Sequence, residues 1–212
     1  PSSDDSRGPR AAGDDVPVLA VAFDLGAVTE PASRRIIVAY DDEYSIEYMG
    51  QRLRPYWRRE GMDPVELLET SEHEAEDLAA RCAQFDDELI DDMTRMGGAK
   101  YARLCALAYR QAQAANKVTA DSNGCPLMFP KENFSNGCIG TVDVIYPMIP
   151  QFLLLNPTLA KAAIAPVLDY AASERWKFPF APHDLGRYPH ANGQVYGGGE
   201  ETQDRQMPVE ES

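Results

Sequence analysis

The 212-residue sequence lacks the features of several protein classes. Its longest apolar run, around residues 145–155, is interrupted by Pro147, Pro150 and Gln151, so it falls short of the ~18 residues that span a membrane. Basic residues are outnumbered by acidic ones, 20 to 34, and the net charge of -14 repels phosphate backbones and anionic membrane surfaces. We therefore expect no transmembrane helix and no nucleic-acid partner.

Signals for metal binding and covalent catalysis are also missing. The four cysteines form no CxxC pair, and the chain has three histidines, so we expect no metal site and no cofactor. Cys82 and Cys105 lie on the apolar faces of predicted helices, where a buried free thiol is usual. Cys125 and Cys138 flank a loop, and their spacing leaves open whether they form a disulfide. No GxSxG motif, Ser-His-Asp order or Cys-His pairing supports an acyl-enzyme mechanism.

The N-terminal quarter of the chain combines a polar lead-in with two β-prone runs. Residues 1–16 are rich in Ser, Asp, Gly, Arg and Pro, which predicts a disordered segment. This segment lacks the basic start and apolar stretch of a signal peptide, so we expect any export signal to lie outside the chain. Residues 18–23 and 34–40 are rich in β-branched residues and predict two strands, which need a larger sheet because two strands alone are marginally stable.

The remainder of the chain predicts mainly helices. Asp63-Pro64 starts a long amphipathic helix that ends at Gly97-Gly98, and residues 99–116 form a second one. Asp121-Ser122-Asn123-Gly124 predicts the turn of a β-hairpin over residues 117–129. Two further helices, at 142–155 and 158–174, are joined by Asn156-Pro157, and residues 176–212 predict a long ordered loop. The order predicts a mainly α fold with some β structure.

The first group of residues with possible chemistry lies between residues 129 and 143, at the expected start of a helix. This loop contains Lys131, Glu132, Asn136 and Asp143, and the positive end of the helix dipole adds to them. A cation, carboxylates and an amide in one loop are suited to binding a polar ligand. The structural alternative is that Asn136-Gly137 forms a turn and Asp143 favours the first helical turn.

Two later groups of residues also carry possible chemistry. His183 and Asp184 adjoin in a loop rich in proline and aromatic residues, where the carboxylate can orient the imidazole as a proton carrier. The alternative is a structural histidine. Glu210 and Glu211 lie just before the last residue, Ser212, and a carboxylate can activate water or act in an acid and base pair. The Gly197–Gly199 run lacks the strand and the Lys-Ser/Thr of a phosphate loop.

These stretches, together with Asp143–Pro147, Leu154–Leu159 and Met207–Ser212, resemble the glutaminase A family of fungi and bacteria. The resemblance is strong from Gly97 to Ser212 and weaker over residues 17–60. It implies an N-terminal β-sandwich, a linker helix and an (α/α) toroid similar to six-hairpin glycosidases. On this basis residues 1–16 are a lead-in, 17–60 the last strands of the sandwich, 61–98 linker helices, and 99–212 the first hairpins and active-face loops of a truncated toroid.

The resemblance further implies a secreted or periplasmic hydrolase several times longer than this chain. Its partners would be a small-molecule substrate, glutamine or a saccharide, and the remainder of the parent chain. An isolated piece of a toroid would expose a large apolar face, so we also expect self-association. This chain alone is expected to be inactive.

Three functions remain open on the sequence. The first is hydrolysis of L-glutamine to glutamate and ammonia, in which Glu210 or Glu211 activates water and Lys131, Asn136 and His183 hold the substrate. The second is an inverting glycosidase that uses two carboxylates. The candidates for that pair are Glu132, Asp143, Asp184, Glu210 and Glu211. The third is a scaffold or interaction module without catalysis.

Overall fold

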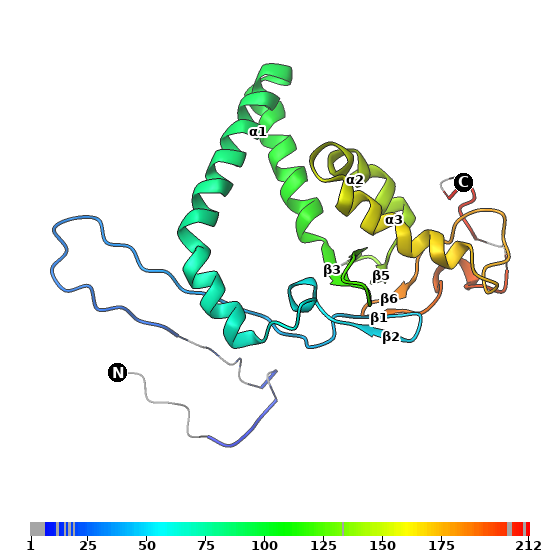
Figure 1. The fold of residues 1–212 in the computed structure, drawn as a ribbon, viewed down its shortest axis with the longest axis horizontal. Helices are drawn as coiled ribbons and strands as arrows, with labels where there is room; N and C mark the ends of the chain where they lie inside the picture. Colours follow the sequence, from blue (N-terminus) through cyan, green and yellow to red (C-terminus); the bar gives the residue numbers. More distant parts are fainter. Residues whose placement is uncertain are drawn as a thin grey trace. The chain divides into compact units, whose positions relative to one another are not determined.

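The computed structural model describes residues 7–11, 13–14, 16, 18, 20–132, 134–202, 205–209 and 211–212. The chain divides into two compact units, residues 1–38 and 39–212. Helices predominate over strands, which confirms the predicted mainly α fold with some β structure (Figure 1). No helix within the described ranges is both long and apolar enough to cross a membrane.

The two strands predicted at 18–23 and 34–40 are absent from the described residues of those segments. Val18 is 83% exposed and Val38 is 73% exposed, so these apolar side chains have no neighbouring layer to pack against. A strand is stabilised by backbone hydrogen bonds to a second strand, and β-branched residues without such a partner do not form one. The prediction of strands here is therefore wrong, whereas the N-terminal β-sandwich stays a prediction.

Helix α1 (Pro64–Ala114) consists of two arms that meet at a bend. Asp63 caps its start by accepting from the backbone N–H groups of Val65 and Glu66, which confirms the predicted helix start. Gly98 has φ 83° and ψ 173°, a conformation nearly restricted to glycine, and the chain reverses direction there. The arms meet at the bend and diverge away from it (Figure 1), and the rings of Phe85 and Tyr109, one from each arm, lie 5.4 Å apart.

The strands form two small sheets, one from neighbouring segments of the chain and one from remote segments. Strands β3 (Asn116–Ala120) and β4 (Pro126–Pro130) form the predicted antiparallel hairpin. The second sheet has the order β2-β1-β7-β6-β5 and joins segments far apart in the sequence. Its strands are β1 (Ile46–Tyr48), β2 (Gln51–Leu53), β5 (Cys138–Ile139), β6 (Gly186–Arg187) and β7 (His190–Ala191). The loop predicted over residues 176–212 therefore contributes two strands.

Helices α2 (Val142–Leu155) and α3 (Pro157–Ala171) form the predicted helical hairpin. The Asn156 side chain caps α3 by accepting from the N–H of Leu159 at 3.3 Å. Short 3-10 turns, η1 (Tyr56–Arg58) and η2 (Tyr196–Gly198), complete the elements. The core lies where these helices meet β4 and the C-terminal loops. It includes Phe129, Ile139, Ile145, Phe152, Ala163, Tyr170, Trp176 and Leu185.

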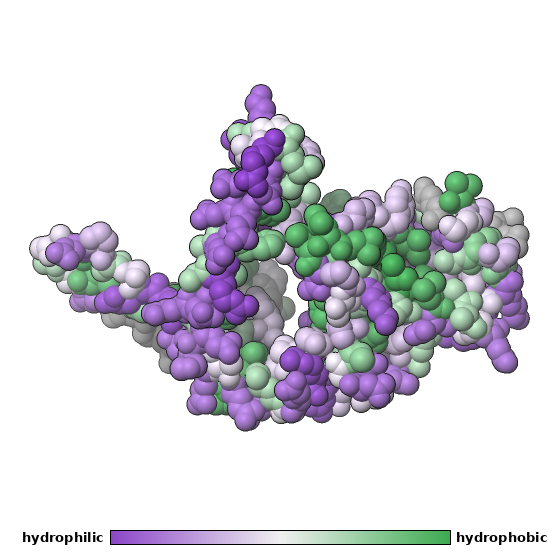
Figure 2. All heavy atoms as spheres, turned by 45° about the horizontal axis from the view of Figure 1, so that its top comes forward, coloured by the Kyte–Doolittle hydropathy of each residue, from purple (hydrophilic) through white to green (hydrophobic). Residues whose placement is uncertain are grey.

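Apolar side chains also lie on the surface of this part of the molecule (Figure 2). On α2, Leu153 is 58% and Leu154 77% exposed, and Leu168 of α3 is 57% exposed. The predicted self-association of an exposed apolar face remains a prediction. The four cysteines are free. Cys82 is exposed, so its predicted burial is wrong, and Cys125 and Cys138 form no disulfide in this structure.

Candidate functional site

The candidate site is positioned by a segment that we call the strap, residues 181–199. The carbonyl of His183 accepts from the N–H of Val142 at 2.8 Å, at the start of α2. The N–H of Leu185 donates to the carbonyl of Ile139 at 2.9 Å, next to β5. These two bonds fix the strap on both sides of His183 and Asp184. The pair is thereby held against the first turn of α2.

Asp184 anchors the strap from inside. Its side chain has no exposed surface, and its carboxylate accepts from the backbone N–H groups of Gly186, Val195 and Tyr196 at 2.9, 3.0 and 3.1 Å. The same carboxylate lies 3.0 Å from Nδ1 of His183. Buried and surrounded by donors from the protein, Asp184 has no access to a substrate. These contacts suit a residue that positions His183, and the predicted catalytic role of Asp184 remains a prediction.

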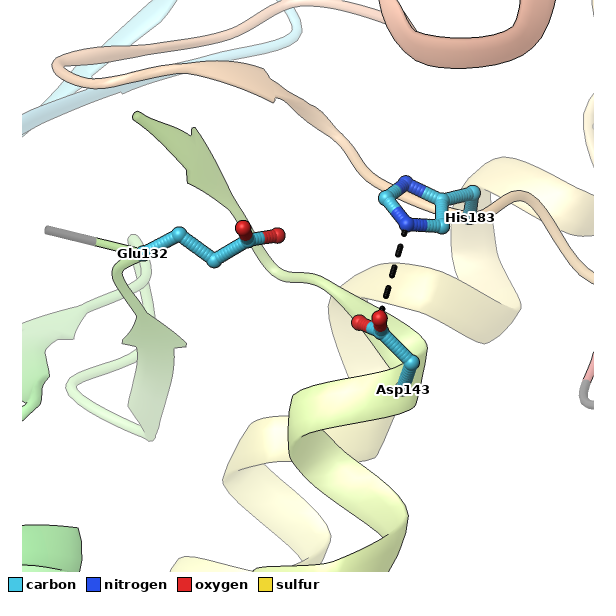
Figure 3. A group of neighbouring side chains, drawn as sticks. All are labelled: Glu132, Asp143 and His183. Atoms are coloured by element: carbon cyan, nitrogen blue, oxygen red, sulfur yellow. Dashed lines mark ion pairs between the residues drawn. The ribbon is translucent and has the colours of Figure 1, made fainter. Parts of the chain in front are cut away.

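His183 is held in one orientation by three kinds of contact. Its side chain is 3% exposed, and its ring stacks on Tyr196 with centroids 4.3 Å apart. Its backbone N–H donates to Oε1 of Gln194 at 2.6 Å. Because an ionised carboxylate only accepts, the contact with Asp184 places a proton on Nδ1. Nε2 then faces Asp143, whose Oδ2 is 3.8 Å away (Figure 3).

Nearby carboxylates set the pKa of His183. Burial alone lowers this pKa, because it disfavours the charged imidazole. The hydrogen bond to Asp184 and the negative charges of Asp184, Asp143 and Glu211 act in the opposite direction. The net result is a pKa raised above the usual 6.5, so the site favours positive charge at this position.

Three of the predicted residues converge from three separate segments. Glu132 follows β4, Asp143 lies in the first turn of α2, and His183 belongs to the strap. One side-chain donor atom of each lies within 4.8 Å of the other two. In Figure 3 the Asp143 and Glu132 side chains extend into the space beside the His183 ring. We call these three residues the triad. A cluster of one imidazole and two carboxylates can move protons or hold a metal ion.

A pocket of about 400 Å³ adjoins the triad and shares Glu132 with it. The pocket contains Lys131 and Asn136, so the structure brings together three residues predicted to bind substrate. It also contains Arg187 and Tyr188, which the sequence analysis missed although both lie in the loop that carries His183. Nζ of Lys131 lies 5.1 Å from the ring centroid of Tyr188. The Asn136 side chain accepts from the N–H of Cys138, as in the structural alternative.

The C-terminal carboxylates lie elsewhere. Glu211 is 5% exposed and lines a different, mainly apolar cavity of about 300 Å³ between α2 and α3. Its carbonyl accepts from the N–H of Ala181 at 2.8 Å. Glu210 lies outside the described residues. The structure therefore joins Glu211 to the site through its charge on His183, and not through the pocket that contains Lys131.

Two family models match consecutive parts of the chain. The Glutaminase A six helical-hairpin domain matches residues 98–212, which confirms the predicted six-hairpin fold class. A model described as Domain of unknown function (DUF5127) matches residues 1–92. The first match begins at the bend of α1 at Gly98 and the second ends six residues before it, so the bend lies close to the boundary between the two matched segments. No solved structure matches the chain.

Curated relatives lead to the same family. Glutaminase A from Aspergillus oryzae is 32% identical over 99% of this chain and 30% of its own length. A protein named "Probable glutaminase" from Arthroderma benhamiae is 29% identical over 93% of this chain and 24% of its own length. The chain thus spans less than a third of the length of either relative. With the six-hairpin match over more than half of its residues, the chain belongs to the glutaminase A family.

Proposed function

We propose that the triad and its adjoining pocket hydrolyse the side-chain carboxamide of L-glutamine, giving glutamate and ammonia. The proposal rests on Glu132, which belongs to both the pocket and the triad. It lines the pocket with Lys131 and Arg187. It also lies in the triad with Asp143 and His183. A small molecule with a charged end and an amide end can occupy both at once. The names of the two fungal relatives support this substrate.

The pocket suits the charged end of an amino acid. The α-carboxylate is attracted by Lys131 and Arg187, and the guanidinium of arginine can bind a carboxylate through two parallel hydrogen bonds. The α-ammonium can pair with Glu132. Such contacts hold the substrate so that its carboxamide reaches the triad, which lowers the entropic cost of the reaction.

Asp143 is the group that we assign to water activation. Its Oδ1 is buried and accepts no hydrogen bond from any residue that the structure describes, so it is available to accept a proton. The oxygen of the activated water bonds to the carbonyl carbon, the carbon–nitrogen bond breaks, and the proton passes to the departing nitrogen, which leaves as ammonia. His183 holds Asp143 through its other oxygen. This assignment replaces Glu211, which lines a separate cavity.

The test is release of ammonia from L-glutamine by the intact protein. We expect Asp143→Asn to lower kcat by about 10²–10⁴-fold, the usual effect of losing a general base. Arg187→Ala should chiefly raise KM, because it removes a binding contact. Asp169→Asn is the matched control, since Asp169 is exposed on α3 and belongs to neither the triad nor the pocket. If the intact protein releases no ammonia while a known glutaminase does so in the same assay, the proposal is wrong.

The spacing of the Glu132 and Asp143 carboxylates also bears on the glycosidase alternative, because it distinguishes retaining from inverting enzymes. Donor oxygens of Glu132 and Asp143 lie within 4.8 Å, which is less than the ~6.5–9.5 Å between the carboxylates of inverting enzymes. The spacing is closer to the ~5–5.5 Å of retaining enzymes. Any glycosidase activity of this pair would therefore retain configuration, and a panel of aryl glycosides analysed by NMR for the anomer formed tests that expectation.

A further inference from the structure

We propose that Glu132, Asp143 and His183 form a binding site for one divalent transition-metal ion of the zinc or manganese type. The proposal concerns binding, so it stands independently of the substrate proposed above. Its basis is the convergence of one nitrogen and two carboxylate oxygens within 4.8 Å, from segments that meet through the fold (Figure 3).

The support behind His183 is the first argument. Histidines that bind metals almost always donate their second ring N–H to a carboxylate or carbonyl, which fixes the ring and its tautomer. Asp184 fills this role at 3.0 Å and is itself fixed by three backbone N–H groups. The side chain of His183 is 97% buried, and its Nε2 makes no hydrogen bond to any described residue. Nε2 faces Asp143, and a Glu132 oxygen lies beside this pair (Figure 3).

The two carboxylates provide the second argument. Two negative groups held close together repel each other unless a cation lies nearby, and either a protonated His183 or a bound metal ion can provide that charge. Oδ1 of Asp143 is buried and has no hydrogen-bond partner within the described part of the chain. Nε2 of His183 and Oδ2 of Asp143 are 3.8 Å apart, so both can lie about 2.1 Å from a single ion. Glu132 is partly exposed and accepts from the Ser135 hydroxyl, and one of its oxygens already lies within 4.8 Å of the other two donor atoms.

The donor set indicates the class of ion. Imidazole nitrogen suits zinc and other transition metals, whereas magnesium and calcium prefer sites made entirely of oxygen. Three protein ligands leave at least one coordination position for water or substrate, as in catalytic rather than structural zinc sites. The expectation of no metal site came from cysteine spacing, which gives no information about a site built from Glu, Asp and His in three segments.

Metal content and affinity provide the test. The intact protein is stripped with a chelator, loaded with Zn²⁺ or Mn²⁺ and freed of unbound ion by gel filtration. Mass spectrometry then measures metal per chain, and titration calorimetry measures affinity. We expect about one equivalent, with His183→Ala and Glu132→Gln weakening binding about tenfold or more. His190→Ala is the matched control, because the His190 side chain is 63% exposed and outside the triad, so its affinity should equal that of the unmodified protein.

The outcomes separate this inference from the proposed function. Metal binding that is equal in His183→Ala and the unmodified protein overturns the inference, as does the absence of retained metal. Circular dichroism checks folding, and Glu132→Gln decides the question if His183→Ala is unfolded, because Glu132 is not part of the core. A protein that binds the ion through the triad but releases no ammonia contradicts only the proposed function. One that releases ammonia but retains no ion after loading contradicts only the metal site.

Discussion

Helix α1 and the strap differ in what holds them in place. Helix α1 has 51 residues of nearly continuous regular structure, all of them described, yet Ala102 is its one buried residue. The strap contains two strands of two residues each and a short 3-10 turn. It nevertheless contributes many of the most buried side chains in the chain. They include His183, Asp184, Leu185, Ala191 and Gln194.

The comparison shows that regular secondary structure and rigid positioning are separate properties. Local backbone hydrogen bonds satisfy α1, and its side chains mostly face water. The strap instead satisfies its backbone through side chains such as Asp184 and through β1 and β5, which are distant in sequence. A catalytic or ligand-binding group needs a fixed position, and the strap provides one for His183. Substitutions matched between the two regions test this difference.

The largest effect is expected at Asp184. Replacement by alanine leaves three backbone N–H groups and Nδ1 of His183 without their acceptor, so the free energy of unfolding should fall by about 3–5 kcal/mol. Asp77→Ala is the control in α1, where Asp77 is 73% exposed and paired with Arg81, and should cost less than about 0.5 kcal/mol. Urea unfolding measures both. Equal losses in the two variants would remove the distinction.

The next effect compares two glycines with positive φ. A Cβ at Gly186, where φ is +137°, would lie 2.2 Å from the carbonyl oxygen of His190, whereas a Cβ at Gly98 would meet nothing within 4 Å. Both alanine variants carry backbone strain of about 1–3 kcal/mol. Gly186→Ala adds a steric clash that costs about 1–3 kcal/mol more. Thermal unfolding should give Gly98→Ala a higher melting temperature than Gly186→Ala. The reverse order would contradict the tight packing of the strap.

Local sequence signals predicted those parts of the fold that local interactions determine. Asp63 starts α1, Gly98 bends it, and Asn156 starts α3, each through contacts within a few residues. The strands β6 and β7 escaped prediction because their partners are remote, with His190 of β7 paired to Glu47 of β1. The β-prone residues at 18–40 were misassigned for the opposite reason, since they have the right side chains but pair with no strand among the residues that the structure describes.

The site was predicted in part. Lys131, Glu132 and Asn136 line one pocket, as expected of residues that share one loop, whereas their binding of a substrate remains a prediction. The positioning role of Asp184 depends on the N–H groups of Val195 and Tyr196, which no spacing rule connects to it. Arg187 was missed because its relevance comes from the pairing of β6 with β5, which carries it to the pocket.

A smaller effect is expected at Tyr170, whose hydroxyl links α3 to the strap. It accepts from the N–H of Gln194 at 3.1 Å and donates to Glu200. Tyr170→Phe should lower the free energy of unfolding by about 1–2 kcal/mol, since a buried N–H loses its acceptor. Tyr109→Phe is the control in α1, because the hydroxyl of Tyr109 bonds to no described residue, and should change little. Guanidinium unfolding measures the free energy of unfolding of both variants. A larger loss in Tyr109→Phe than in Tyr170→Phe would contradict the difference between α1 and the strap.

The smallest effect is expected at the start of α1. Asp63→Ala removes the acceptor for the N–H groups of Val65 and Glu66, which costs about 1 kcal/mol. Because α1 buries little, this loss should appear as local opening of the helix start. Amide hydrogen exchange should become faster at residues 65–67 and stay unchanged at residues 184–196. Asp86→Ala, an exposed mid-helix control, should leave both unchanged. Faster hydrogen exchange in the strap of the Asp63→Ala variant would instead show that α1 and the strap unfold as one cooperative unit. The rigidity of the strap would then depend on the helix as well as on Asp184.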